Sequence, residues 1–172
     1  MQLTADKQFL NQIQGIRDRI FRITKRILIS HEEAEDATQE VIIKLWKMDK
    51  DKLESFKNIE AYSITMAKNY CLDRLKSKQA QVLSLNEKLA VKQSDSLQKQ
   101  IEVSDQMDWV EKLIEQLPEK ERLILQLREI EQYDFDQIAS ILEIPEGTVR
   151  VYLSRIRKKI KKQFLLIQAH GA

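Results

Sequence analysis

The fold is decided by residues 134–164, which read DFDQIASILEIPEGTVRVYLSRIRKKIKKQF. Asp134 followed by Gln137 is the pairing that caps the start of a helix, and it predicts a short helix to Leu142. A turn around Pro145 ends that helix, and an apolar stripe then recurs at steps of three and four: Val149, Leu153, Ile156 and Ile160. The stripe predicts a second helix to about residue 164. Two such helices around a tight turn indicate a helix-turn-helix.

The last 26 residues of the chain are strongly basic, although the whole chain is nearly neutral. Its 172 residues hold 29 Lys and Arg against 27 Asp and Glu, a net charge of +2. Residues 108–146 carry 4 basic and 11 acidic side chains, whereas residues 147–172 carry 7 basic and no acidic ones. This contrast is expected where a DNA-reading helix rests on a support that does not touch DNA.

The outer face of the final helix offers side chains suited to the major groove. With the apolar stripe turned inward, this face holds Arg150, Val151, Ser154, Arg155, Arg157 and Lys158. Arg150 and Arg155 are the base-reading candidates, because a guanidinium can donate two hydrogen bonds to one guanine. Cations further along suit phosphates. The alternative is a solvated cationic face that the helix dipole favours.

The first half of the chain carries three further helical patterns. Apolar residues from Phe9 to Ile27 predict a helix over about 4–29, and Ser30 with Glu33 forms a capping box that starts a second. Residues 49–58 break the period. A third helix is predicted over 59–79 by a stripe at Ile64, Ala67, Cys71 and Leu75.

The predicted fold class is all-α, with two small helical domains joined by a flexible linker. Three Gly and two Pro leave little with which to build hairpin turns. The domains are predicted at 1–79 and 107–172, and the Gln-, Ser- and Lys-rich residues 80–106 form a linker that could hold a short helix.

Several classes of protein are not expected. Without a long apolar stretch or a signal sequence, the chain is expected to stay in the cytoplasm and to have no membrane span. One Cys and two His, far apart in sequence, predict no disulfide within the chain and no zinc site of His and Cys ligands. With no Gly-rich phosphate loop and no recognisable acid and base pair, we expect no enzyme, metal, cofactor or small-molecule substrate.

A family resemblance covers nearly the whole chain. Residues 117–122 (LPEKER), 134–139 (DFDQIA) and 145–157 (PEGTVRVYLSRIR) closely resemble the promoter-reading domain of bacterial sigma factors, most strongly the extracytoplasmic-function (ECF) group. Residues 34–41 (AEDATQEV), with Lys44-Leu45-Trp46, and residues 58–78 resemble the amino-terminal core domain of that family. The segments follow the family's order.

The resemblance implies partners as well as a fold. It implies docking on the clamp coiled coil of the RNA polymerase β′ subunit through Asp36, Gln39, Glu40 and Ile43, which are spaced to share one helix face. Without the resemblance, these residues equally fit an ordinary acidic helix face. Other partners that the resemblance implies are the polymerase β flap, promoter DNA and an anti-sigma factor.

The resemblance also implies two DNA contacts. The upstream (minus-thirty-five) element is assigned to Thr148, Arg150, Val151, Ser154, Arg155, Arg157 and Lys158. The downstream (minus-ten) element is assigned to Phe56, Lys68, Asn69, Asp73 and Lys76. Phe56 is the aromatic residue available to stack on a flipped base, with Leu53 as its rival. Tyr62 and Tyr70 are interpreted as core residues.

The leading hypothesis is a promoter-specificity subunit of bacterial RNA polymerase that acts without catalysis. One alternative is an autonomous helix-turn-helix regulator that binds duplex DNA as a dimer. Another is a helical interaction protein that has lost DNA binding and sequesters a regulator. The chain departs from the family pattern at Tyr62, often Trp, and at Gln132, where Gly commonly precedes the helix-turn-helix.

Overall fold

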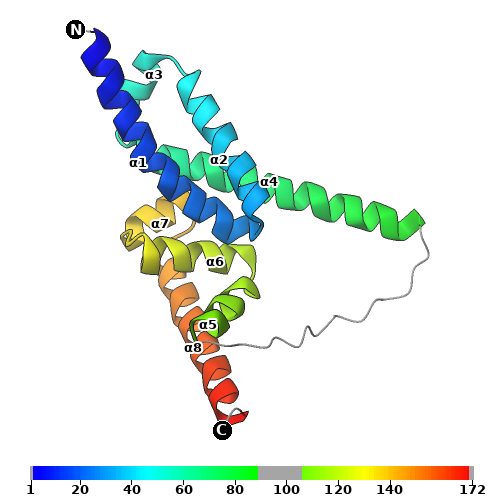
Figure 1. Ribbon diagram of the computed structural model, residues 1–172. Helices are drawn as coiled ribbons and strands as arrows, with labels where there is room; N and C mark the ends of the chain where they lie inside the picture. Colours follow the sequence, from blue (N-terminus) through cyan, green and yellow to red (C-terminus); the bar gives the residue numbers. More distant parts are fainter. Residues whose placement is uncertain (1, 89–105, 171–172) are drawn as a thin grey trace.

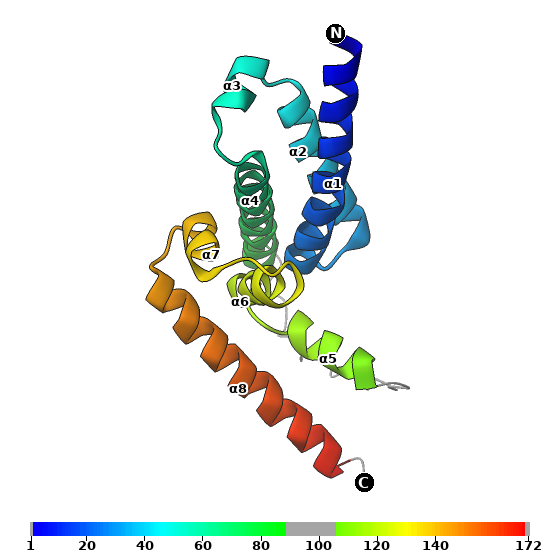
Figure 2. The ribbon, with the colours of Figure 1, turned by 90° about the vertical axis from the view of Figure 1, so that its left-hand side faces the viewer.

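The computed structural model describes residues 2–88 and 106–170, and these residues form helices and turns throughout (Figure 1). No strand occurs within these two ranges, so the predicted all-α class is confirmed. Two helical units pack against each other, and α8 ends the second unit away from the first (Figure 2).

The amino-terminal unit is built on α1 (Gln2–Leu28), which packs against both α2 (His31–Trp46) and α4 (Ile59–Lys88). Between α2 and α4 lies the short helix α3 (Lys50–Ser55), in the segment where the sequence shows only a break in the apolar period. The predicted stripes are divided between two cores. The first, which also takes in Leu53 of α3, contains Ile16, Ile20, Val41, Leu45, Leu53 and Ala67.

The junction between α1 and α2 has the Ser30 half of the predicted capping box, whereas the Glu33 carboxylate pairs with Lys78 of α4. The Ser30 hydroxyl accepts a hydrogen bond from the backbone N–H of Glu33 at 3.3 Å, which satisfies one of the free donors at the start of α2. Ile29 before it has φ of 66°, and this left-handed residue turns the chain back on itself.

Helix α4 is longer than the sequence predicts. It continues nine residues past 79 to Lys88, and near its far end Val82, Leu83 and Leu85 are each more than half exposed. Because these apolar residues do not pack into a core, their spacing carries no stripe, and sequence periodicity misses this part of the helix. The remainder of the predicted linker, residues 89–105, lies outside the described residues.

The carboxy-terminal unit consists of α5 (Gln106–Glu115), α6 (Glu119–Leu125), a π-helical turn η1 (Gln126–Ile130), α7 (Phe135–Leu142) and α8 (Glu146–His170). Helix α6 passes directly into η1, so residues 119–130 are helical throughout. Helix α8 continues six residues beyond the predicted end at Phe164.

The helix-turn-helix has the predicted local structure. The Gln137 side chain accepts a hydrogen bond from the Asp134 backbone N–H at 3.0 Å, as in a capping box. Helix α7 ends at Glu143, which has φ of 56°, and the Ile144 N–H returns to the Ala139 carbonyl at 3.1 Å. The stripe residues that fix the rotation of α8 are buried: Val149, Leu153 and Ile156.

A second hydrophobic core crosses between the two units. It joins residues of α1 and α4, such as Ile23, Ile27 and Ile64, to residues of the carboxy-terminal unit, such as Leu123 and Ile138. Helix α1 contacts α6, and α4 contacts α7. In this arrangement the two units therefore bury apolar surface against each other.

Gln132 provides a test of the local turn. It is exposed and has φ of 58°, a left-handed conformation that is strained for a side chain and free for glycine. We expect Gln132→Gly to raise the free energy of unfolding by about 0.5–1 kcal/mol, the relief of strain exceeding the added entropy of the unfolded chain. Urea denaturation measures the change. Gln132→Ala keeps the strain and serves as the control; equal stability of both variants would contradict this account.

Candidate nucleic-acid interface

The outer face of α8 presents the predicted upstream-element residues together. Arg150, Ser154, Arg155, Arg157 and Lys158 are exposed, Val151 is 48% exposed and Thr148 is half-buried. Because the opposite stripe is buried, the helix presents this one face to solvent.

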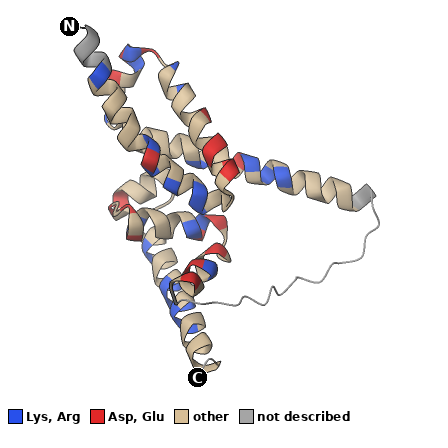
Figure 3. Ribbon diagram, in the orientation of Figure 1, with Lys and Arg blue, Asp and Glu red and all other residues tan. Residues whose placement is uncertain are grey.

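Acidic residues of the same unit flank the basic helix (Figure 3). Arg157 donates through Nε to Oε1 of Glu129 at 3.0 Å, and the Lys159 ammonium donates to Oε2 of Glu121 at 3.0 Å. Such exposed pairs each contribute at most about 1 kcal/mol, so phosphate groups can displace them. Arg155 and Lys158 form no ion pair with any residue in the described ranges.

A groove of about 630 Å³ runs along α4 and contains Asn69 and Asp73, two of the predicted downstream-element residues. Lys76 is exposed on the same helix. Sequence reasoning did not assign Lys44 of α2 to this site, because its position in the groove depends on how α2 packs on α4. Its ammonium lies 5.5 Å from the centroid of the Tyr70 ring.

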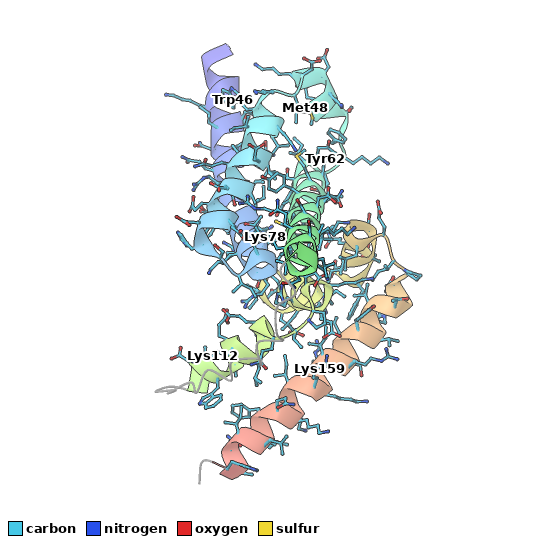
Figure 4. The ribbon with its side chains drawn as sticks, turned by 90° about the vertical axis from the view of Figure 1, so that its right-hand side faces the viewer. Trp46, Met48, Tyr62, Lys78, Lys112 and Lys159 are labelled. Carbon is cyan, nitrogen blue, oxygen red and sulfur yellow. The ribbon has the colours of Figure 1, made fainter. Side chains whose placement is uncertain are left out.

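Tyr62 and Tyr70 each have two roles. Both rings are half-buried and pack against a core, as the sequence analysis expects, yet both also line the α4 groove. Figure 4 labels Tyr62 near the start of α4. The sequence interpretation therefore accounts for the core contacts of each ring but not for its place in the groove.

Phe56 lies in the loop before α4, at a second groove of about 650 Å³. Its ring stacks on Tyr62 with centroids 4.1 Å apart and planes 18° apart, and it is half-buried. Leu53, the rival residue, is only 4% exposed and belongs to the core. Phe56 is therefore the more accessible of the two for stacking on a base.

Lys68 differs from the other predicted DNA contacts because it is buried between the two units. It is 5% exposed, and its ammonium donates to the carbonyl oxygen of Ile141, in the last turn of α7, at 2.8 Å. Burial lowers the pKa of Lys68, and the negative charge of Glu143 partly opposes that effect. In this arrangement Lys68 holds the helix-turn-helix unit and is inaccessible to DNA.

Arg122 of α6 makes the reciprocal contact. Arg122 is 8% exposed, and its guanidinium donates to the carbonyl oxygens of Arg26 at 2.9 Å and Ile27 at 2.7 Å, in the last turn of α1. It also donates to the carbonyls of Leu117 and Glu115 in its own unit. Carbonyls at a helix end lack partners within the helix, so one cation from each unit caps a helix of the other.

Glu131 is the main carboxylate at the boundary between the units. Its side chain is 2% exposed and receives two hydrogen bonds from Arg22, at 2.8 and 2.9 Å, while the Nε atom of Arg19 lies 3.1 Å away. Burial alone would raise the pKa of Glu131, but hydrogen bonds from Arg22 and Gln126 and the nearby cations lower it below its usual value. The carboxylate therefore stays charged at neutral pH, and its contribution to packing is lost only as pH falls through that lowered pKa.

The predicted polymerase-binding residues share an exposed face of α2. Asp36, Gln39 and Glu40 are exposed, and Ile43 is 46% exposed. Trp46, one turn further and 59% exposed, extends this face (Figure 4). The sequence analysis did not assign Trp46, although its spacing of three from Ile43 is the signal that could have included it.

The fold and these exposed faces define a two-domain helical DNA-binding protein. Comparison with known families identifies it further. Residues 13–81 match the model of sigma-70 region 2, and residues 107–160 match that of sigma-70 region 4. The chain belongs to the sigma-70 family, in the ECF group, and is a promoter-specificity subunit of RNA polymerase.

Relatives of the chain align over most of its length. The ECF RNA polymerase sigma factor SigW of Bacillus subtilis is 26% identical over 90% of this chain and 88% of its own. The RNA polymerase sigma-H factor of Pseudomonas aeruginosa is 29% identical over 84% of this chain and 79% of its own. The fold resembles that of the sigma factor RpoE from Bartonella quintana, solved with the anti-sigma factor NepR, with a TM-score of 0.72 and 19% identity over 94% of this chain and 98% of that one.

Two features are absent from the described residues. Within residues 2–88 and 106–170, no helix combines the length and apolar character needed to cross a membrane. The same part of the chain contains no group of three or more His, Cys, Asp or Glu side chains arranged to hold a metal ion.

The burial of Lys68 predicts its reactivity. In the free protein, we expect an amine-acetylating reagent to modify Lys68 much more slowly than Lys76, which is exposed on the same helix. Arg122→Gln should weaken the packing of the two units by roughly 2–4 kcal/mol, because α1 carbonyls lose buried partners, and should speed the modification of Lys68. Mass spectrometry of a labelling time course measures both rates.

Arg128→Gln is the matched control, because Arg128 donates to the carbonyl of Tyr133 within its own unit. It should leave the Lys68 rate unchanged. Equal rates for Lys68 and Lys76 in the unaltered protein would show that the two units do not pack this way in solution.

Proposed function

We propose that this sigma factor divides promoter recognition between its two domains. Residues 107–172 bind the upstream element as duplex, and residues 1–79 bind polymerase and open the downstream element. The observation that carries this proposal is the exposure of a polar, basic face on each unit, on α8 and on α4, each backed by a buried stripe.

At the upstream element, α8 enters the major groove. Arg150 and Arg155 read base edges, Val151 offers a methyl contact and Ser154 offers an adaptable hydrogen bond. Thr148, Arg157 and Lys158 bind the DNA backbone. A phosphate takes the place of the Glu129 carboxylate on Arg157. The acidic surface around α6 keeps the rest of this domain away from DNA.

At the downstream element, the α4 groove holds the unpaired strand. Asn69 and Asp73 provide polar contacts, and Lys68 and Lys76 neutralise phosphates. Phe56 stacks on an extruded base, an interaction of about 1–3 kcal/mol per base. The Tyr62 ring already stacks on Phe56. This contact supports the role, because it holds in place the ring on which the base would stack.

Docking on polymerase uses the exposed face of α2. Asp36, Gln39 and Glu40 suit Arg side chains on the clamp coiled coil of β′, and Ile43 supplies the apolar contact at the centre. The carboxy-terminal domain contacts the β flap. The protein acts in the cytoplasm, and it contributes binding and DNA opening without catalysis or a bound cofactor.

The closed packing of the two units is a state that must open for this function. Lys68 reaches DNA only when Ile141 releases it, so binding of polymerase or DNA has to compensate for the loss of the contacts between the units. An anti-sigma factor is a fitting partner for the closed state, since the Bartonella quintana protein of the same fold was solved with one.

Transcription from a genomic DNA library with purified core polymerase tests the proposal. Adding this protein should create new start sites that share two spaced upstream elements. Ile43→Glu places a charge in the centre of the polymerase contact and should abolish the new starts, because an unpaired charge is costly to bury. Leu10→Glu, the same kind of change at an apolar residue of α1 that is 45% exposed and outside the assigned set, is the control.

If new starts were absent while the protein alone bound specific duplex DNA, the autonomous regulator would replace this proposal. New starts that survive Ile43→Glu would contradict only the assigned polymerase contact.

A further inference from the structure

The ring of Phe135 holds Arg150, one of the two base-reading candidates. Phe135 is the first residue of α7, and Arg150 lies in the first part of α8. The guanidinium carbon of Arg150 lies 4.0 Å from the centroid of the ring, a distance typical of stacking between a guanidinium and an aromatic face. Helices on both sides of the turn therefore meet at this side chain.

The ring itself is held in place. Phe135 is half-buried and packs against the core that the two units share. It follows Asp134, whose backbone N–H is bound by the Gln137 side chain. The guanidinium carbon of Arg128 lies 4.4 Å from the same centroid, and Arg128 is anchored on the carbonyl of Tyr133. These contacts leave the ring little freedom to turn away.

Arg150 has a second anchor of a different kind. It donates to the carboxylate of Glu146, one helical turn earlier, at 2.8 Å. Its side chain is nevertheless 57% exposed, so the stacked guanidinium still faces solvent. The ion pair is exposed and easily screened, whereas the ring contact depends little on salt.

We propose that Phe135 is a positioning residue that sets the base preference of Arg150. The inference rests on the proposed function, in which Arg150 reads a base edge. Two hydrogen bonds to one guanine require the guanidinium plane to lie in the plane of the base. An unrestrained Arg loses much rotamer freedom when it adopts that geometry, and the Phe135 ring removes part of that loss before DNA binds.

Arg155 offers a comparison within the same helix. It is the other base-reading candidate, it is exposed, and no aromatic ring among the described residues stacks on it. Loss of the Phe135 ring should therefore weaken discrimination at the base that Arg150 reads and leave unchanged the discrimination that depends on Arg155.

The experiment selects DNA with the full-length protein and core polymerase from a duplex library randomised at the upstream element. Arg150→Ala and Arg155→Ala first identify which position each side chain reads. We expect Phe135→Leu to reduce the preference at the Arg150 position roughly two- to fivefold, the loss of an exposed stacking contact. Phe135→Tyr keeps an aromatic face and should retain the preference, and Lys158→Ala should weaken all sequences alike.

The readout is the ratio of affinities for two sequences within one variant, which does not depend on how much of the variant is folded. Phe135→Met is used if Phe135→Leu does not fold. An equal loss on every sequence for Phe135→Leu would overturn the proposal and leave a structural role. If Glu146→Gln instead reduces the preference at the Arg150 position, the ion pair and not the ring positions Arg150.

The proposed function fails separately. If Arg150→Ala changes no base preference, then Arg150 does not read DNA, and the role of Phe135 falls with it. If Arg150→Ala flattens one position and Phe135→Leu does not, the base-reading role stands and only the positioning role is wrong.

Discussion

The arrangement of the two units depends on the exchange of one buried cation in each direction. Arg122 caps the last turn of α1 and Lys68 caps the last turn of α7, so each domain completes a helix end of the other. A buried carbonyl oxygen without a hydrogen-bond donor costs free energy, and neither helix supplies donors for its own last carbonyls. The helices that make these caps also contribute to the apolar core that joins the units, so the two sets of contacts are compatible.

This exchange links architecture to function through α4. One helix supports the amino-terminal core, lines the groove proposed for the downstream element and binds the helix-turn-helix unit through Lys68. The contacts that stabilise the closed chain therefore compete with one of the proposed DNA contacts. Because of this competition, the free chain binds a promoter less readily than its exposed residues alone indicate. Polymerase must displace the contacts between the units.

Much of the fold could be predicted from the sequence because its helices carry regular apolar stripes and recognisable caps, such as Ser30 with Glu33 and Asp134 with Gln137. The same periodicity predicted which residues of α8 face solvent. The end of α4 could not be predicted, since Val82 and Leu85 pack on nothing that would give them a period. The burial of Lys68 was also beyond sequence reasoning, because the chain that buries it is 73 residues away.

The most direct test of the closed arrangement is a distance between the units, measured by pulsed electron paramagnetic resonance on spin labels at Gln14→Cys in α1 and Gln163→Cys in α8. Both positions are exposed, and the native Cys71 is buried with its pKa raised to about 12, so it should escape labelling. The account predicts one narrow distance distribution in the free protein and a shift to longer distances on addition of core polymerase. A broad distribution in the free protein, or one that polymerase leaves unchanged, would contradict it.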